Sequence, residues 1–258
     1  MFVDSHCHLN YQGLVEDQPA VLARARSAGV ELMLNISTRM SEWDDVIGTA
    51  EREDDVTASV GIHPHEADRH PDVDTAALVA KAAHPKVVGI GETGLDYYYD
   101  HSDRDHQRQS FRAHIAASRE TQLPLIVHTR DAEADTYAIL AEEMGKGRFP
   151  ALIHCFTGTG AFAEQVLELG LYISLSGIVT FKNARQLQET AREVPLERLL
   201  IETDSPFLAP VPHRGKPCEP AFVADTAKFL AGLRNEPLEA LAAATSVNFR
   251  TLFAKAAA

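Results

Sequence analysis

The chain has 258 residues, of which 45% are hydrophobic and 24% charged, so it is too apolar for a disordered protein and long enough to bury a large core. Its 24 Lys and Arg against 37 Asp and Glu give a formal net charge of −13, the opposite of the basic surface that coats DNA nonspecifically. We therefore expect any nucleic-acid ligand to be held locally, for example through bound divalent cations.

Short runs of aliphatic and β-branched residues recur along the whole chain. The eight runs lie at 2–6, 32–37, 57–62, 87–92, 125–129, 151–155, 172–177 and 199–204. Because apolar residues dominate these runs instead of alternating with polar ones, they predict parallel strands that are covered on both faces.

Segments of helical composition and period follow the eight runs. They lie at 19–29, 41–54, 75–84, 105–122, 132–145, 160–170, 183–194 and 219–234. An extra C-terminal helix, at 236–256, is expected to pack outside. Eight alternations of strand and helix predict an α/β protein, a closed (β/α)8 TIM barrel forming a single domain over 1–258, with a doubly wound open sheet as the alternative.

The cysteines and the apolar segments bear on location. Cys7, Cys155 and Cys218 are widely spaced and form no C-x-x-C pair, which is typical of a protein in the reducing cytoplasm. The first residues carry no export signal, and no window approaches the ~20 apolar residues of a membrane span. We expect a cytoplasmic protein with no membrane contact and no obligate protein partner, in which Cys7 and Cys155 face the helix layer.

Histidines concentrate at the carboxyl ends of the expected strands, where the loops of a barrel form its active site. Six of the twelve histidines lie there, namely His6, His8, His63, His65, His128 and His154. Two carboxylates, Glu92 and Asp204, close further apolar runs. This concentration favours chemistry over a purely structural role for these side chains.

Six of these groups are expected to bind metal. In the H-x-H of the first strand, His6 and His8 point to one face, so both imidazoles can reach one point. Four imidazoles and two carboxylates exceed what one catalytic ion takes from protein, so we expect two divalent ions. The expected division gives His6, His8 and Asp204 to one ion and His128 and His154 to the other, with Glu92 bridging them. Such ligands accept Mg, Mn, Zn, Co or Ni.

Other residues near the strand ends are candidates for substrate contacts. His63 and His65 are expected to donate hydrogen bonds to a phosphate. Arg130 is expected to bind a phosphate oxygen, with an ion pair to Asp131 or Glu133 as the alternative.

Two further features leave alternatives open. The tyrosines at 97–99 are expected either to stack on bases or, more commonly, to pack a loop against the barrel rim. Glu202 is expected to orient a ligand histidine from behind, with a buried salt bridge in the barrel core as the alternative.

Six motifs in this order and spacing resemble the TatD family of metal-dependent deoxyribonucleases, within the amidohydrolase superfamily. They are VDSHCHLN, SVGIHPHE, GIGETGLDYYYD, LIVHTRDA, LIHCFTGT and IETDSPFLAP. The resemblance covers nearly the whole chain. It implies the same barrel, two divalent ions on the six ligands named above, and hydrolysis of phosphodiester bonds, usually of single-stranded DNA from the 3′ end.

The expected reaction is attack on the phosphodiester by a metal-bound hydroxide, as in a 3′-5′ exonuclease. Asp204 is the expected general base, and a role as metal ligand alone is the alternative. An amidohydrolase-type enzyme that opens an amide, lactone or aminoacyl ester is the competing function. In that class a carboxylated lysine would bridge the metals, but no strand ends in Lys at the relevant place, and Glu92 takes the bridging role instead. A noncatalytic metal-dependent scaffold is a third possibility.

Overall fold

Eight parallel strands form one sheet in the computed structural model, which describes residues 1–257; the last residue of the expected domain, Ala258, lies outside the described residues. The strands are β1 (Phe2–Cys7), β2 (Val30–Asn35), β3 (Val56–Val60), β4 (Val87–Asp96), β5 (Leu125–Arg130), β6 (Ala151–Ile153), β7 (Tyr172–Leu175) and β8 (Leu199–Ile201). Their order in the sheet is their order in the chain. A parallel bridge from Cys7 to Ser205 closes the circle, which confirms the (β/α)8 barrel.

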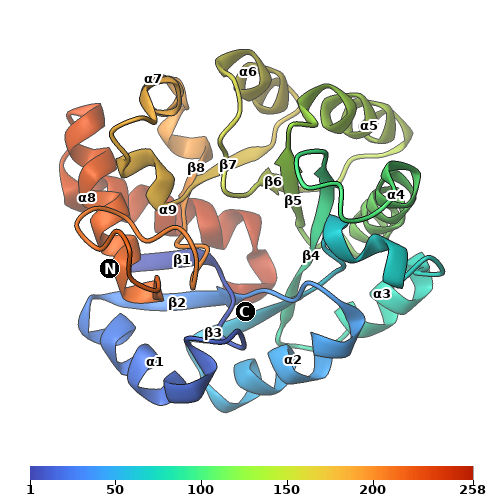
Figure 1. The fold of residues 1–258 in the computed structure, drawn as a ribbon, viewed down its shortest axis with the longest axis horizontal. Helices are drawn as coiled ribbons and strands as arrows, with labels where there is room; N and C mark the ends of the chain where they lie inside the picture. The colour runs from blue at the N-terminus through green and yellow to red at the C-terminus, as the bar shows by residue number, and fades with distance from the viewer. Residues whose placement is uncertain (258) are drawn as a thin grey trace.

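Helices surround the strands as an outer ring (Figure 1). They are α1 (Gln18–Ser27), α2 (Trp43–Arg52), α3 (Thr75–Ala82), α4 (Arg104–Thr121), α5 (Glu133–Lys146), α6 (Gly160–Glu168), α7 (Arg185–Glu193) and α8 (Val223–Arg234). Buried residues of these helices and the outward-facing residues of the strands form the larger apolar core. No helix among residues 1–257 is long and apolar enough to cross a membrane.

The expectation that the last helix packs outside was wrong. Helix α9 (Leu238–Leu252) contributes Phe249, which with Phe253 joins a second core made of inward-facing residues such as Val3, Ile126 and Leu200. These strand residues lie near the amino ends of their strands, so α9 covers that end of the barrel. Periodicity identified the apolar face of this helix, but it carries no information about the surface against which that face packs.

His114 on α4 links the helix layer to the segment that carries His63. Its Nε2 accepts a hydrogen bond from the Ile62 amide at 3.0 Å, and its Nδ1 donates to the Ser110 carbonyl at 2.7 Å. These two bonds require the neutral imidazole. The side chain is fully buried, and burial lowers the pKa of His114 to about 4.

Neutral His114 is expected to make the protein acid-sensitive. Its stabilising effect is complete above the unfolded pKa of about 6.5 and is lost as the pH falls toward the folded pKa, because the unfolded chain takes up the proton first. Between pH 7 and pH 5 the free energy of unfolding should fall by about 2 kcal/mol more in the wild type than in His114→Gln. Urea unfolding at both pH values measures this difference, and His106→Gln, exposed on the same helix, should not reduce the pH slope. Equal slopes in the wild type and His114→Gln would contradict the assignment.

Candidate metal centre

Three of the expected ligands meet where β1 adjoins the segment after β8. The Asp204 amide donates to the His6 carbonyl at 2.9 Å, and the His8 amide donates to the Ser205 carbonyl at 2.8 Å. These bonds place Asp204 beside the H-x-H of β1, although β8 itself ends three residues earlier, at Ile201. The Nε2 atoms of His6 and His8 lie 3.3 Å apart, and they lie 3.6 and 3.4 Å from Asp204 Oδ1.

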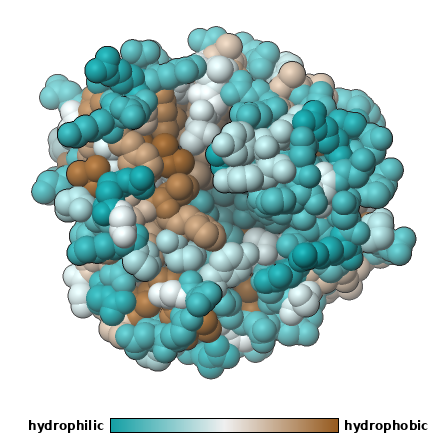
Figure 2. All heavy atoms as spheres, viewed as in Figure 1, coloured by the Kyte–Doolittle hydropathy of each residue, from teal (hydrophilic) through white to brown (hydrophobic). Residues whose placement is uncertain are grey.

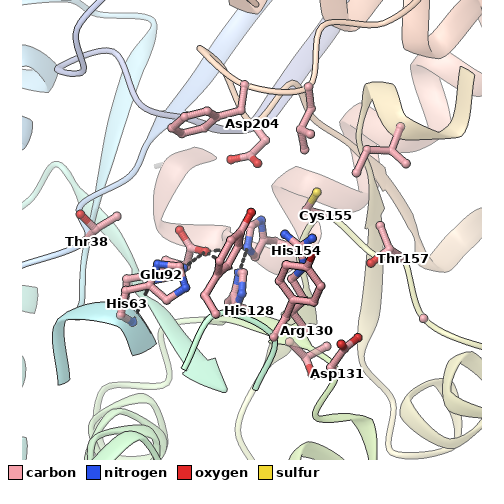
Figure 3. Close-up of a pocket in the computed structure, with 18 of the residues that line it drawn as sticks. Thr38, His63, Glu92, His128, Arg130, Asp131, His154, Cys155, Thr157 and Asp204 are labelled. Atoms are coloured by element: carbon pink, nitrogen blue, oxygen red, sulfur yellow. Dashed lines mark hydrogen bonds and ion pairs between the residues drawn. The ribbon is translucent and has the colours of Figure 1, made fainter. Parts of the chain in front are cut away.

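Glu92 on β4 completes this first cluster and begins a second, with His63, His128 and His154 around it in Figure 3. Its Oε2 lies 3.4 Å from His6 Nε2 and 3.9 Å from His8 Nε2, so we call His6, His8, Asp204 and Glu92 Oε2 the His8 group. Its Oε1 lies 2.7 Å from His154 Nε2 and 3.1 Å from His128 Nδ1. The Glu92 carboxylate therefore faces both clusters and directs a different oxygen to each.

His63 lies in the second cluster as well. Its Nε2 is 3.4 Å from Glu92 Oε1, and the His128 and His154 ring nitrogens are 3.3 Å apart. We call His63, His128, His154 and Glu92 Oε1 the His128 group. The structure thus brings all six expected ligands together, and it places His63, expected to contact substrate, beside them. His63 Nδ1 accepts the His65 amide at 3.1 Å, so its Nε2 carries the proton and faces Glu92 as a donor.

A glycine two residues after Glu92 allows β4 to lie close against β5 beside the metal centre. Gly94 has φ of +140°, and a Cβ at this position would lie 2.0 Å from the His128 carbonyl oxygen. A side chain is therefore excluded, since it would clash with the neighbouring strand and strain the backbone. β4 pairs Gly94 with His128 and runs four residues beyond Glu92, to Asp96.

The spacing of the ligand atoms fits cation binding. Protein ligands lie about 2.0–2.2 Å from a zinc-sized ion, so two of them at tetrahedral or octahedral angles are about 3.0–3.5 Å apart. Most separations within the two groups, from 3.1 to 3.6 Å, fall near this range. Gathering this many imidazoles and carboxylates in a buried place is costly without a cation. The residues present therefore fit a metal centre.

Charge interactions outweigh burial for both carboxylates of the cluster. Burial would raise the pKa of Glu92, but His154 and His63 hold it well below its usual range. The pKa of Asp204 is lowered in the same way, by His8 and His6 against the effect of burial. Both side chains are consequently anionic at neutral pH and suited to face cations.

Glu202, expected to orient a ligand histidine from behind, lies behind His154. It is fully buried, and its Oε1 lies 3.3 Å from His154 Nδ1 while accepting the Cys155 amide at 2.8 Å. Burial lowers the pKa of His154, but Glu92 and Glu202 outweigh it and raise that pKa well above the usual value. A hydrogen bond at Nδ1 leaves Nε2 directed toward Glu92.

Asp96 was missed in the sequence. Its Oδ2 lies 3.0 Å from His65 Nε2 and 3.1 Å from His128 Nε2, so the carboxylate contacts one residue expected to bind substrate and one expected to bind metal. The signal was present, because the apolar run continues past Glu92 as TGLD. The strand was predicted to end at Glu92, whereas β4 continues to Asp96.

Arg130 lines the cavity and lies against aromatic rings. Its guanidinium carbon is 4.1 Å from the centre of the Tyr98 ring and 4.8 Å from that of Tyr99. Within residues 1–257 it forms no ion pair with Asp131 or Glu133, so that alternative is not observed. Tyr97, the first of the three tyrosines, donates a hydrogen bond to Asp135 Oδ2 at 2.7 Å and packs its loop against the barrel rim.

The expectation that Cys155 faces the helix layer was wrong, although Cys7 does so. Cys7 is buried in the outer core, whereas Cys155 lines the cavity with its sulfur 3.2 Å from the Ser176 hydroxyl. The residue has a positive φ of 42°, so the chain turns immediately after His154. β6 ends at Ile153, and the strict alternation that predicted an outward Cys155 does not extend past the strand.

The two groups lie at the base of a cavity of about 1060 Å³. On the face that Figure 2 shows, a hollow lies near the centre of the molecule, with an apolar area on one side and polar side chains on the other. Phe207, Leu208 and Ile178 line the cavity, as do Tyr98 and Tyr99. Phe207 is 50% exposed, Tyr98 56% and Tyr99 49%, so three aromatic rings are available to a ligand.

Known proteins resemble this chain along nearly its whole length. A family profile described as TatD related DNase matches residues 3–254. The uncharacterized metal-dependent hydrolase YcfH of Escherichia coli (strain K12) is 47% identical, covering 97% of this chain and 95% of that protein. A Citrobacter koseri protein named 3′-5′ ssDNA/RNA exonuclease TatD is 36% identical, covering 97% of this chain and 98% of its own.

Solved structures agree with this assignment. The crystal structure of YjjV, a TatD homologue from Escherichia coli K12, matches with a TM-score of 0.92 at 30% identity and covers 98% of each chain. An organophosphorus hydrolase mutant from Deinococcus radiodurans matches at a TM-score of 0.64 and 18% identity, which shows a shared fold alone. The resemblance carried by the six sequence motifs is confirmed, and the chain belongs to the TatD family of metal-dependent hydrolases.

Proposed function

We propose that this hydrolase cleaves phosphodiester bonds of single-stranded DNA from the 3′ end and that it uses two divalent ions. The observation that carries the proposal is Glu92, whose two oxygens face different imidazoles, Oε2 at 3.4 Å from His6 and Oε1 at 2.7 Å from His154. The His8 group is proposed to hold one ion and the His128 group the other. Such ions lower the pKa of a bound water and neutralise charge on phosphoryl oxygens.

Asp204 is the proposed general base. Its side chain is 15% exposed, whereas that of Glu92 is 3% exposed, so Asp204 lies nearer to the cavity and to an incoming water. Its lowered pKa keeps it anionic, so that one carboxylate oxygen can accept the proton of the attacking water while His6 and His8 flank the other. The proton then passes to the leaving 3′ oxygen.

The cavity walls support a nucleic-acid substrate. Arg130 offers a guanidinium for a phosphate oxygen, and Tyr98, Tyr99 and Phe207 offer exposed rings on which bases can stack. His65 lies at the same mouth with its Nε2 directed to Asp96, so it is proposed to contact the phosphate from the Nδ1 edge of its ring. The family description and the name of the Citrobacter koseri relative point to the same substrate class. We further propose a cytoplasmic location, which the three unpaired cysteines support.

Asp204→Asn is expected to abolish the nuclease activity. With 5′-labelled single-stranded DNA and Mn²⁺, the wild type should produce a ladder shortened from the 3′ end and release 5′-mononucleotides, and EDTA should stop it. The variant should lose about 10³-fold or more in kcat, because an amide cannot accept the proton. Asp44→Asn, an exposed carboxylate on α2, should retain wild-type activity. Activity that survives both Asp204→Asn and chelation would reject the mechanism, and turnover of an amide or lactone but not DNA would favour the competing function.

A further inference from the structure

Asp96 has every hydrogen-bonding position of its carboxylate occupied. Oδ1 accepts the amides of Tyr98 at 3.1 Å and Tyr99 at 2.9 Å. Oδ2 lies 3.0 Å from His65 Nε2 and 3.1 Å from His128 Nε2. The side chain is 1% exposed, so water does not compete for these contacts.

The two oxygens face two different parts of the site. Oδ1 holds the turn that carries Tyr98 and Tyr99, the rings against which the Arg130 guanidinium lies. Oδ2 faces His128, whose other ring nitrogen, Nδ1, lies 3.1 Å from Glu92 Oε1 within the His128 group. One buried side chain therefore joins the metal centre to the wall of the cavity.

The carboxylate also determines which nitrogen of His128 is free to bind a cation. An ionised carboxylate only accepts hydrogen bonds, so His128 must carry its proton on Nε2, which leaves the lone pair on Nδ1. We propose that Asp96 is a positioning residue that makes His128 an Nδ1 ligand of the ion in the His128 group and, through the same carboxylate, fixes the Tyr98–Tyr99 turn beside it. This inference rests on the proposed ion in the His128 group.

Asp96→Asn separates the two roles. An asparagine offers one oxygen and one NH₂, and the backbone amides of Tyr98 and Tyr99 can only donate, so the oxygen stays with them. The NH₂ then faces the two imidazoles, and His128 can relieve the clash of donors by moving its proton to Nδ1, where Glu92 accepts it. A protonated Nδ1 cannot bind a cation. The turn should therefore remain, while the ion of the His128 group binds more weakly.

The experiment measures metal binding with Mn²⁺ alone, by calorimetric titration of the apo proteins, and therefore requires no DNA. Asp96→Asn should weaken one of two Mn²⁺ sites by about 10- to 100-fold, which is typical when the partner of a ligating histidine is removed. The matched control is Asp103→Asn in the same loop, where the carboxylate accepts the amides of Asp105 and His106 and touches no site residue. The control should bind both ions with affinities within twofold of the wild type.

A spectroscopic measurement on the wild type keeps the test decisive even if Asp96→Asn does not fold. In the Zn²⁺-loaded protein, long-range ¹⁵N correlation spectra should show His128 bound through Nδ1 with its proton on Nε2; the signal is identified by its loss in His128→Gln. Binding through Nε2, or an Asp96→Asn protein with unchanged Mn²⁺ affinities, would overturn the role of Asp96. A wild type that hydrolyses no DNA, while Asp96→Asn still loses an ion, would overturn the proposed substrate and support the role of Asp96.

On DNA, the same variant should show a split between kinetic constants. Because the Tyr98–Tyr99 turn is kept, KM for a single-stranded oligonucleotide should stay within threefold of the wild type, while kcat at limiting Mn²⁺ falls at least tenfold. Excess Mn²⁺ should restore much of kcat in Asp96→Asn. An increase in KM alone, with no dependence on Mn²⁺, would show that Asp96 acts on the cavity wall only and would overturn its proposed role at the metal centre.

Discussion

Replacing Glu92 by glutamine is expected to reduce kcat for DNA hydrolysis by about 10³-fold or more, a rise of at least about 4 kcal/mol in the activation barrier. Glu92 faces both the His8 group and the His128 group, so its loss weakens both proposed ion sites at once. Glutamine keeps the size of the side chain but has a single carbonyl oxygen and no charge. Glu92→Gln should therefore weaken metal binding in both groups.

Thermal unfolding with and without metal measures the same loss independently of activity. At a free Mn²⁺ concentration 1,000 times Kd, one bound ion stabilises the folded state by about 4 kcal/mol, which is roughly 8 °C in Tm for a chain of this size. The wild type should show such an increase and Glu92→Gln little or none. Glu143→Gln removes an equally buried carboxylate outside the cluster and should retain the metal-dependent increase. A Glu92→Gln protein with the full increase in Tm would reject the bridging assignment.

Truncating Phe249 to alanine is expected to destabilise the protein by about 3–5 kcal/mol, the usual cost of removing a buried phenylalanine. Phe249 is fully buried and stacks on Phe253, with ring centres 4.6 Å apart, inside the amino-terminal end of the barrel. Because Phe249 packs among the inward-facing residues of the strands, the substitution should leave a cavity there. Urea unfolding measures the change.

The matched control for Phe249→Ala is Val247→Ala on the same helix. Val247 is 61% exposed, so its truncation should change the free energy of unfolding by no more than about 0.5 kcal/mol. Both variants should keep the wild-type kcat while folded, since the metal centre lies at the opposite ends of the strands. A loss below about 1 kcal/mol for Phe249→Ala would contradict the role of Phe249 in closing this end of the barrel.

Much of the site was predictable because a parallel barrel places the carboxyl ends of its strands around one opening. Three of the ligands lie within strands, namely His6, Glu92 and His128, and His154 lies one residue past β6. The pattern of apolar runs was therefore enough to group them. The barrel itself followed from the eight runs and their helices. These inferences depend only on local periodicity and on a general property of the fold.

Other features depend on contacts between segments far apart in the chain. Asp96 was overlooked because the length of β4 is set by its pairing with β5, which continues to Arg130. Cys155 turns into the cavity because β6 ends at Ile153, a boundary that periodicity alone does not define. His63 joins the His128 group through a side-chain distance to Glu92 that no spacing in the sequence encodes.

The sequence by itself therefore determined the barrel, the opening at which chemistry is placed, and six side chains that meet there. Only the tertiary structure decided which atoms of those side chains face one another, which carboxylate holds His128, and that the last helix covers the opposite end of the barrel. The physical reason is that apolar periodicity reports whether a residue is buried. Hydrogen-bond partners and packing surfaces are chosen among all buried groups once the chain has folded.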